Sequence, residues 1–110
     1  MLKESYYVKI RTAVPRTAAE KVRRAMGRAG AGKQGKYENC SSSYLSVGRF
    51  TPVAGANPSI RKVGRSEKVK EEIIEMLCSK DKARRVIKAL KKAHPYEEPA
   101  IDILPRLEIE

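Results

Sequence analysis

The chain has 110 residues, with 24 lysines and arginines against 13 aspartates and glutamates, a formal net charge of +11. A hydrophobic content of 41% is ordinary for a globular protein and excludes global disorder, and no apolar run is long enough for a membrane-spanning helix. We expect one domain over residues 1–110, and a cytoplasmic location, because the sequence opens without a signal-peptide pattern. The positive charge can attract nucleic acid, anionic ligands or acidic proteins.

The first third of the sequence predicts a strand followed by a helix. Apolar and polar side chains alternate over residues 6–14, as in a half-buried strand that ends at Pro15. Residues 17–20 have the pattern of a capping box, and apolar residues recur at helical spacing over 18–29. Gly30 is the predicted C-cap. The outward basic side chains of this helix are Lys21, Arg23, Arg24 and Arg28.

The glycines after this helix imitate two phosphate-binding motifs. Gly30, Gly32 and Gly35 match the dinucleotide fingerprint, and Gly30 with Gly35 and Lys36 matches most of a P-loop. In both motifs the glycines leave a strand and open a helix, so that the phosphate meets the helix N-terminus. Here a helix precedes Gly30 and a strand-like run comes after Tyr37, so we predict neither nucleotide motif.

The middle of the chain is extended in character. Residues 40–47 and 49–54 have strand-like patterns, and Pro52 in the second favours a sheet edge or a bulge. Together they predict a long hairpin, or a bent and edge-exposed arm, at about residues 37–58.

The last third predicts a strand, a helix and a short strand. Helix propensity would merge residues 69–78 with the next helix, but their apolar alternation also suits a strand, and Ser79 suits an N-cap. A helix over residues 83–93 ends before Pro95, and residues 100–104 form a short apolar strand. The outward basic side chains of this helix are Arg84, Arg85, Lys88, Lys91 and Lys92.

The order of these elements predicts an α+β fold, the ferredoxin-like split βαβ sandwich, with an antiparallel sheet and two helices on one face. This prediction depends on residues 69–78 being a strand. It places the basic arcs of the two helices side by side, which makes nucleic acid a candidate partner. The candidate nucleic-acid contacts are Arg24, Arg28, Arg84, Arg85, Lys88, Lys91 and Lys92.

Six short blocks occur in a specific order along the chain. They are Gly30-Ala31-Gly32, Tyr37, Cys40-Ser41, Gly48-Arg49-Phe50-Thr51-Pro52, Gly55-Ala56-Asn57-Pro58 and His94-Pro95-Tyr96-Glu97-Glu98. In this combination, the sequence from about Val14 to Pro105 closely resembles the domain inserted in bacterial Nif-three-like dinuclear-metal proteins. The last block is also similar to the end of CutA proteins, and both groups resemble the PII signalling proteins in fold.

The resemblance implies a CutA/PII-like unit that assembles as a trimer, with sheets inward and helices outward, and it supports a strand over residues 69–78. In the Nif-three-like proteins the metals are held by flanking halves that these residues do not match. The resemblance therefore implies no metal site, no cofactor and no catalysis in this segment. Two residues depart from the family pattern: Gln34 replaces an aliphatic residue, and Arg61 replaces a glycine.

Two further groups of residues could carry chemistry. The block His94-Pro95-Tyr96-Glu97-Glu98 offers a histidine and two carboxylates, which suit a metal or an acid–base site. Because the chain has one histidine, we interpret the block as structural or as a subunit interface, with His94 capping the last helix carbonyls. Cys40 and Cys78 would form a redox or copper pair if adjacent, and packed thiols are the favoured interpretation.

Glycines and polar residues in the connections form the candidate ligand site. Glycine-rich backbone with nearby cations can hold an anion, and in a trimer of the implied kind these loops lie near clefts between subunits. Ordinary turns are the alternative interpretation. The candidate residues are Gly30, Gly32, Lys33, Gly35, Lys36, Arg49, Asn57 and Arg61.

The sequence therefore favours a non-catalytic homotrimeric module that has a regulatory or assembly role or binds a small anionic ligand. The alternative is a nucleic-acid-binding protein that uses the basic faces of both helices. Five tyrosines and one phenylalanine are too few to favour stacking on single-stranded bases. No nucleophile–base pair or metal-ligand cluster in the sequence supports an enzyme.

Overall fold

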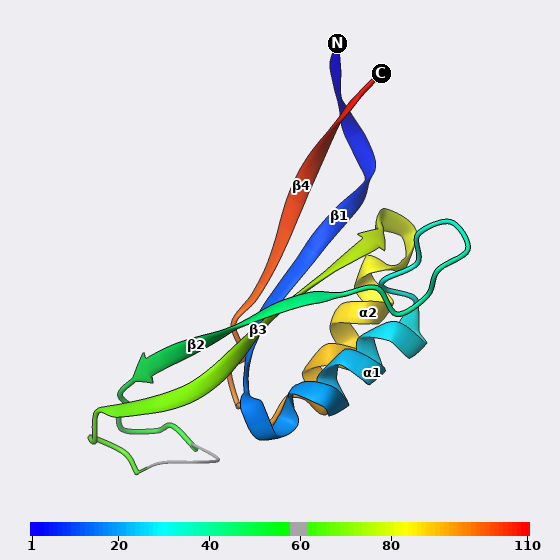
Figure 1. Ribbon diagram of the computed structural model, residues 1–110. Coiled ribbons are helices and arrows are strands. Elements are labelled where there is room, and N and C mark those ends of the chain that lie inside the picture. The colour runs from blue at the N-terminus through cyan, green and yellow to red at the C-terminus, as the bar shows by residue number, and fades with distance from the viewer. Residues whose placement is uncertain (58–61) are drawn as a thin grey trace.

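The computed structural model describes residues 1–57 and 62–110, and within them four strands form one antiparallel sheet in the order β2-β3-β1-β4. Two helices pack against each other on one face of this sheet (Figure 1). The predicted α+β fold is confirmed. In chain order the elements are β1 (Leu2–Pro15), the 3-10 turn η1 (Arg16–Ala18), α1 (Ala19–Ala29), β2 (Ser42–Phe50), β3 (Glu67–Ser79), α2 (Lys80–Ala93) and β4 (Ile101–Ile109).

The core lies between the sheet and the two helices. In β1 and β3 every second side chain faces the helices, and the register places Ile10 opposite Met76 and Thr12 opposite Ile74. The helices contribute apolar residues at helical spacing to this core. No helix in the described ranges is long and apolar enough to cross a membrane. The buried helix residues are Ala19, Val22, Met26, Ala29, Val86 and Leu90.

Residues 69–78 form a strand, as the alternating pattern and the resemblance indicated. They make up most of β3, which pairs with β1 on one side and with β2 on the other. A central strand satisfies its N–H and C=O groups on both edges, which outweighs the helix propensity of its glutamates and lysines. Ser79 occupies the N-cap position of α2 as predicted, but its side chain makes no capping hydrogen bond.

The capping box predicted over residues 17–20 is not formed. The turn η1 takes its place, and the N-cap of α1 is Ala18, which makes no side-chain capping hydrogen bond. Pro15 has a φ of −53° and leads directly into η1, so Thr17 lies inside a turn and not in the extended conformation of a cap. At the other end of α1, Gly30 is the C-cap, as predicted.

The arm predicted at residues 37–58 differs from the structure in its pairing. The two expected strands are one strand, β2, whose ladder with β3 is continuous over nine residues. The hairpin therefore joins β2 to β3 and is not closed within residues 37–58. Pro52 lies beyond the last paired residue and interrupts no ladder hydrogen bond, while β2 is an exposed edge strand.

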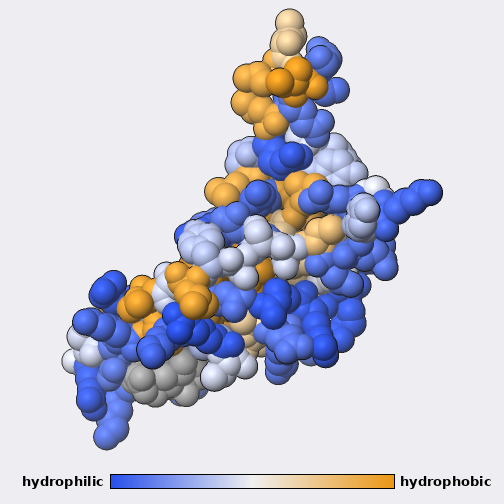
Figure 2. Space-filling model, in the orientation of Figure 1, coloured by the Kyte–Doolittle hydropathy of each residue, from blue (hydrophilic) through white to orange (hydrophobic). Residues whose placement is uncertain are grey.

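β4 is longer than the strand predicted over residues 100–104, and it continues through Pro105. The proline is tolerated because β4 is an edge strand and Pro105 lies beside a bulge in its pairing with β1. Beyond the bulge, β1 and β4 project from the body as a two-stranded ribbon, so the two termini lie together (Figure 1). Figure 2 shows a hydrophobic surface at this tip, whose exposed residues include Leu2, Leu107 and Ile109.

Candidate functional site

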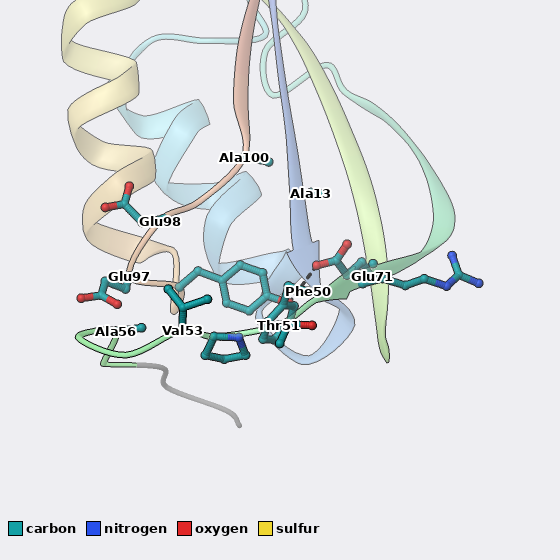
Figure 3. A pocket seen from close by; sticks show the side chains of 13 residues that line it. Ala13, Phe50, Thr51, Val53, Ala56, Glu71, Glu97, Glu98 and Ala100 are labelled. Carbon is teal, nitrogen blue, oxygen red and sulfur yellow. Dashed lines mark hydrogen bonds between the residues drawn. The ribbon is translucent and has the colours of Figure 1, made fainter. Parts of the chain in front are cut away.

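A pocket of about 520 Å³ opens at the end of β2, and we call it the β2-end pocket. One wall consists of residues 48–53 and another of residues 96–98, which come after α2 (Figure 3). Ala13 of β1 and Glu71 of β3 also line it, and both belong to the rows of the sheet that face away from the helices. Two blocks that are far apart in the sequence therefore meet at the uncovered face of the sheet.

Glu71 is a carboxylate held almost out of solvent, with 6% of its surface exposed. Its Oε2 accepts a hydrogen bond of 2.8 Å from the hydroxyl of Tyr96. The carboxylate also covers the Cα of Gly48, where any Cβ would overlap it. A glycine inside a strand often marks such a close approach. Glu71 was not predicted from the sequence, and Gly48 was the signal that could have indicated it.

His94 lies at the end of α2 and turns its ring into the protein. Its Nε2 donates to the carbonyl of Ala13 at 2.7 Å, and its Nδ1 accepts from the amide of Tyr96 at 3.1 Å. Because a backbone amide can only donate, these contacts fix the neutral imidazole with its proton on Nε2. His94 is the C-cap of α2, and its backbone amide donates to the carbonyl of Leu90 at 2.9 Å. Its ring does not bind the helix carbonyls, and it ties the loop after α2 to β1.

The ring of Tyr96 forms part of the pocket wall and lies close to two other rings. The Tyr96 ring lies 4.9 Å from the His94 ring and 6.0 Å from the Phe50 ring, measured between centroids. Glu97 accepts a hydrogen bond from the amide of Asn57 at 2.9 Å, which connects the loop to the residues beyond β2. Among the described residues, no three histidine, cysteine or acidic side chains are grouped so that they could hold a metal.

We expect the protein to lose stability as the pH falls below about 6.5 because of His94. Burial lowers the pKa of His94 in the folded protein below its ordinary value of 6.5. Its contribution to stability is therefore complete above pH 6.5 and decreases as the pH falls toward the folded-state pKa, because unfolding then takes up a proton. Urea unfolding at about pH 8 and about pH 5.5 measures this loss. In the variant His94→Gln, the difference in unfolding free energy between the two pH values should be much smaller. A difference equal to that of the unmodified protein would contradict the assignment of the pH dependence to His94.

The candidate ligand residues that the structure describes do not form one site. Gly30 and Gly32 use their amides within the fold, donating to the carbonyls of Gly27 at 3.1 Å and Leu77 at 2.7 Å. These two amides are therefore not available to an anion. Both glycines lie in the connection that leads from the end of α1 back to the sheet, and their amides hold this connection in place.

Three more candidates, Lys33, Gly35 and Lys36, lie on an exposed turn. Two backbone hydrogen bonds of 2.9 Å between Gln34 and Tyr37 close this turn. It precedes the first residue of β2, so the nine residues of this strand lie between it and the end of β2 (Figure 1). The lysines of this turn and the β2-end pocket are therefore two separate places.

Arg49 and Asn57 are the candidates that the structure brings to the β2-end pocket. Arg49 lines it, and Asn57 is bound to its wall through Glu97. Arg61 lies outside the described residues.

The candidate nucleic-acid residues occupy the two helices, whose surface is strongly hydrophilic (Figure 2). Two of them are partly engaged. Arg85 donates through Nε to the carbonyl of Ala29 at 2.8 Å, and Arg24 pairs with Glu20 at 2.8 Å. The others are exposed and form no ion pair with any described residue: Arg28, Arg84, Lys88, Lys91 and Lys92.

The two thiols have different surroundings. Cys78 is buried in the core, where burial raises the pKa of its thiol and so disfavours the reactive thiolate. Cys40 is half-buried, and its amide donates to the carbonyl of Gly32 at 2.9 Å. Neither is in a disulfide.

No family model matches the chain. It is 44% identical over 102 residues to a GTP cyclohydrolase 1 type 2 homolog of Halalkalibacterium halodurans, covering 93% of this chain and 27% of that protein. The homolog of Bacillus subtilis is 44% identical over 97 residues, covering 88% and 26%. A crystal structure of a Bacillus cereus protein related to NIF3 aligns with a TM-score of 0.79 at 40% identity, covering 96% of this chain and 26% of that chain. The chain is a homologue of one segment of these NIF3-related proteins.

This NIF3-segment homologue spans about a quarter of the length of those relatives. CutA from Archaeoglobus fulgidus aligns with a TM-score of 0.65 at 18% identity, covering 91% of this chain and 83% of that chain. Bacillus subtilis GlnK, solved as a complex with ATP, aligns with a TM-score of 0.61 at 14% identity, covering 91% and 81%. Identities this low establish the fold alone. The NIF3-segment homologue has a CutA/PII-like fold, as the resemblance implied.

Proposed function

We propose that the protein is a non-catalytic CutA/PII-like module that assembles as a homotrimer and binds a small ligand in the β2-end pocket. One observation carries the proposal: residues 48–52 of one sequence block and residues 96–98 of another meet at this pocket, on the sheet face that the helices leave uncovered. The module has a regulatory role if ligand binding there changes the contacts of the assembly.

The uncovered face of the sheet is suited to burial in an assembly. Arg11 lies within this face, and its guanidinium is 3.2 Å from the carboxylate of Asp102 and 3.3 Å from the hydroxyl of Tyr44. Tyr44 is paired with Ile73, which is 4% exposed. Charges that already have partners within the chain cost less to bury than unpaired ones. A homotrimer with its sheets inward would cover this mixed surface.

The lining of the pocket indicates the kind of ligand. Phe50, Pro52 and Tyr96 offer apolar surface. The side chain of Arg49 alternates with those of Gly48 and Phe50 along β2, so its planar cation lies at the rim, where it meets a carboxylate or phosphate that extends out of the pocket. A volume of about 520 Å³ is in the range of small-molecule sites. We propose a ligand with a flat or apolar portion and an anionic group. The similar fold solved with ATP makes a nucleotide one of the first probes.

The test is thermal stabilisation by ATP and by small dicarboxylic acids, at constant ionic strength, together with the mass of the assembly in solution. A ligand at about one hundred times its Kd should stabilise the folded state by about 2.7 kcal/mol. Arg49→Gln should weaken binding about tenfold, which corresponds to about 1.4 kcal/mol. Arg84→Gln on α2 removes the same charge elsewhere and should have no such effect. Equal weakening by both variants, or no stabilisation beyond that of salt, would overturn the ligand site.

Nucleic-acid binding is the second candidate, and the exposed cations on both helices favour it. Arg84 and Lys88 on α2, with Arg28 on α1, give that surface its charge. Such binding would be to phosphates and would weaken steeply with salt. Binding of a duplex that persists at physiological salt would support this function over the ligand module.

A further inference from the structure

A second pocket, of about 400 Å³, lies between α1 and the segment that leads into β2. Asn39 and Ser41 line it from that segment, and Met76 lines it from β3. We call it the arginine groove. The residues that α1 contributes to it are Glu20, Arg23, Arg24 and Arg28.

The three arginines of the groove differ in how firmly they are held. Arg23 is bound to the carboxylate of Glu72 on β3, so its charge is already matched. Arg24 pairs with Glu20, but 69% and 66% of these side chains are exposed, and such a pair contributes little. Arg28 forms no ion pair with any residue in the described ranges. Two guanidinium groups are therefore available to an external anion.

The spacing of Arg24 and Arg28 sets them on one side of α1. Residues four apart on a helix are neighbours, and two like charges at this spacing destabilise the helix by a few tenths of a kcal/mol. A doubly charged anion between them reverses the sign of that interaction. The planar guanidinium matches the oxygen pairs of phosphate, so a phosphate group is the anion this spacing favours.

The opposite wall adds polar groups that are held in place. Asn39 has a φ of +56°, and its side-chain oxygen packs against the Cα of Gly27, which has no side chain to block it. Ser41 adds a hydroxyl, and Met76, which is 2% exposed, gives the groove an apolar floor. The groove is larger than a phosphate ion requires, so it has room for an organic portion above Met76.

We propose that the arginine groove binds a phosphate group between Arg24 and Arg28, with Asn39 and Ser41 as further hydrogen-bonding partners. The phosphate belongs either to a small phosphorylated compound or to a nucleic-acid backbone. This site is distinct from the β2-end pocket and does not depend on a ligand there. In the alternative interpretation the two arginines are ordinary solvated cations, and Arg28 lies in the last turn of α1, where the helix dipole favours positive charge.

The experiment is a titration of the full chain with inorganic phosphate, monitored by NMR of the backbone amides and the arginine Nε–H groups, with sodium chloride as the ionic-strength control. We expect saturable shifts confined to residues 39–41 and to the side chains of Arg24 and Arg28. Arg28→Gln should weaken phosphate binding at least about fivefold, while Arg84→Gln, the same change on α2, should leave it within about twofold. Arg23 is not mutated in this experiment, because its ion pair with Glu72 supports the fold.

Two further titrations identify the source of the phosphate. If it is a small compound, glycerol phosphate should saturate the groove and Arg84→Gln should remain without effect. If it is nucleic acid, a short duplex should shift the same groove signals, and cations on α2 should matter as well. In the titration with inorganic phosphate, shifts that grow linearly without saturation, or equal weakening by Arg28→Gln and Arg84→Gln, would show adventitious attraction to a basic surface and overturn the proposal.

Discussion

Replacing Gly32 with alanine is expected to destabilise the protein by roughly 3 kcal/mol or more, because two costs combine. The residue has a φ of +80°, which L side chains rarely adopt, and a Cβ there would lie 2.6 Å from the carbonyl oxygen of Cys40. The backbone O and N of Cys40 cannot rotate away, whereas the Cε of Met76, 2.8 Å from the same position, belongs to a flexible side chain. Moving them would strain the hydrogen bonds of Gly32 to Leu77 and Cys40, 2.7 and 2.9 Å long. Urea unfolding at a fixed protomer concentration measures the loss.

Gly35 provides the matched control for this prediction. Its φ is +58°, but nothing lies within 4 Å of the position that its Cβ would take. Gly35→Ala should therefore cost only the backbone strain, about 1 kcal/mol. The difference between the two variants isolates the contact of residue 32 with Cys40. If both variants lost the same stability, steric exclusion at Gly32 would be refuted.

The pair also shows how far glycine spacing could be interpreted from the sequence. The letters of Gly30, Gly32 and Gly35 fit a nucleotide motif, and only the order of helix and strand around them argued against it. That argument is local, and it was available from the pattern. The reason why residue 32 must be glycine could not be predicted from the pattern. It depends on contacts with Cys40 and Leu77, which a loop and the register of the sheet bring to Gly32 and no local pattern specifies.

Fold class could be predicted because its determinants are periodic. Helical spacing identified α1 and α2. Alternation over residues 69–78 allowed a strand against its helix propensity, and the family resemblance supported that choice. The ends of the strands and helices were harder to predict from the sequence, because they depend on which strands pair and in which register. The register of β2 with β3 joined two expected strands into one, and the geometry at Pro15 displaced the expected capping box.

The candidate site was predicted only in part, because it is assembled from distant segments. The block at residues 94–98 was singled out, but its partner Glu71 was not, since a glutamate in a strand of alternating charge looks like a solvent-facing residue. The cations near Gly30 and the cation Arg49 were grouped by composition. The structure places them at opposite ends of β2, which runs between them (Figure 1).

Replacing Gly48 with alanine should destabilise the protein by about 2 kcal/mol and disturb the β2-end pocket. A Cβ at this position would overlap the carboxylate of Glu71 and force it to move. Glu71 is buried and accepts the hydrogen bond of Tyr96, so its displacement breaks a contact that holds the loop after α2. In an open strand the same change would be stabilising by roughly 0.5–1 kcal/mol, because alanine loses less entropy than glycine. The sign of the measured effect is therefore informative.

A double-mutant cycle separates this cause from a general intolerance of alanine in β2. In a Glu71→Ala background the obstructing carboxylate is gone, so adding Gly48→Ala should be neutral or slightly stabilising, and the two changes should be strongly non-additive. Tyr96→Phe supplies the independent control: it removes the hydrogen bond to Glu71 but leaves the carboxylate above residue 48. Gly48→Ala should then remain destabilising in the Tyr96→Phe background. Additive losses in the Glu71→Ala cycle would mean that Gly48 is required for a reason other than the carboxylate that covers it.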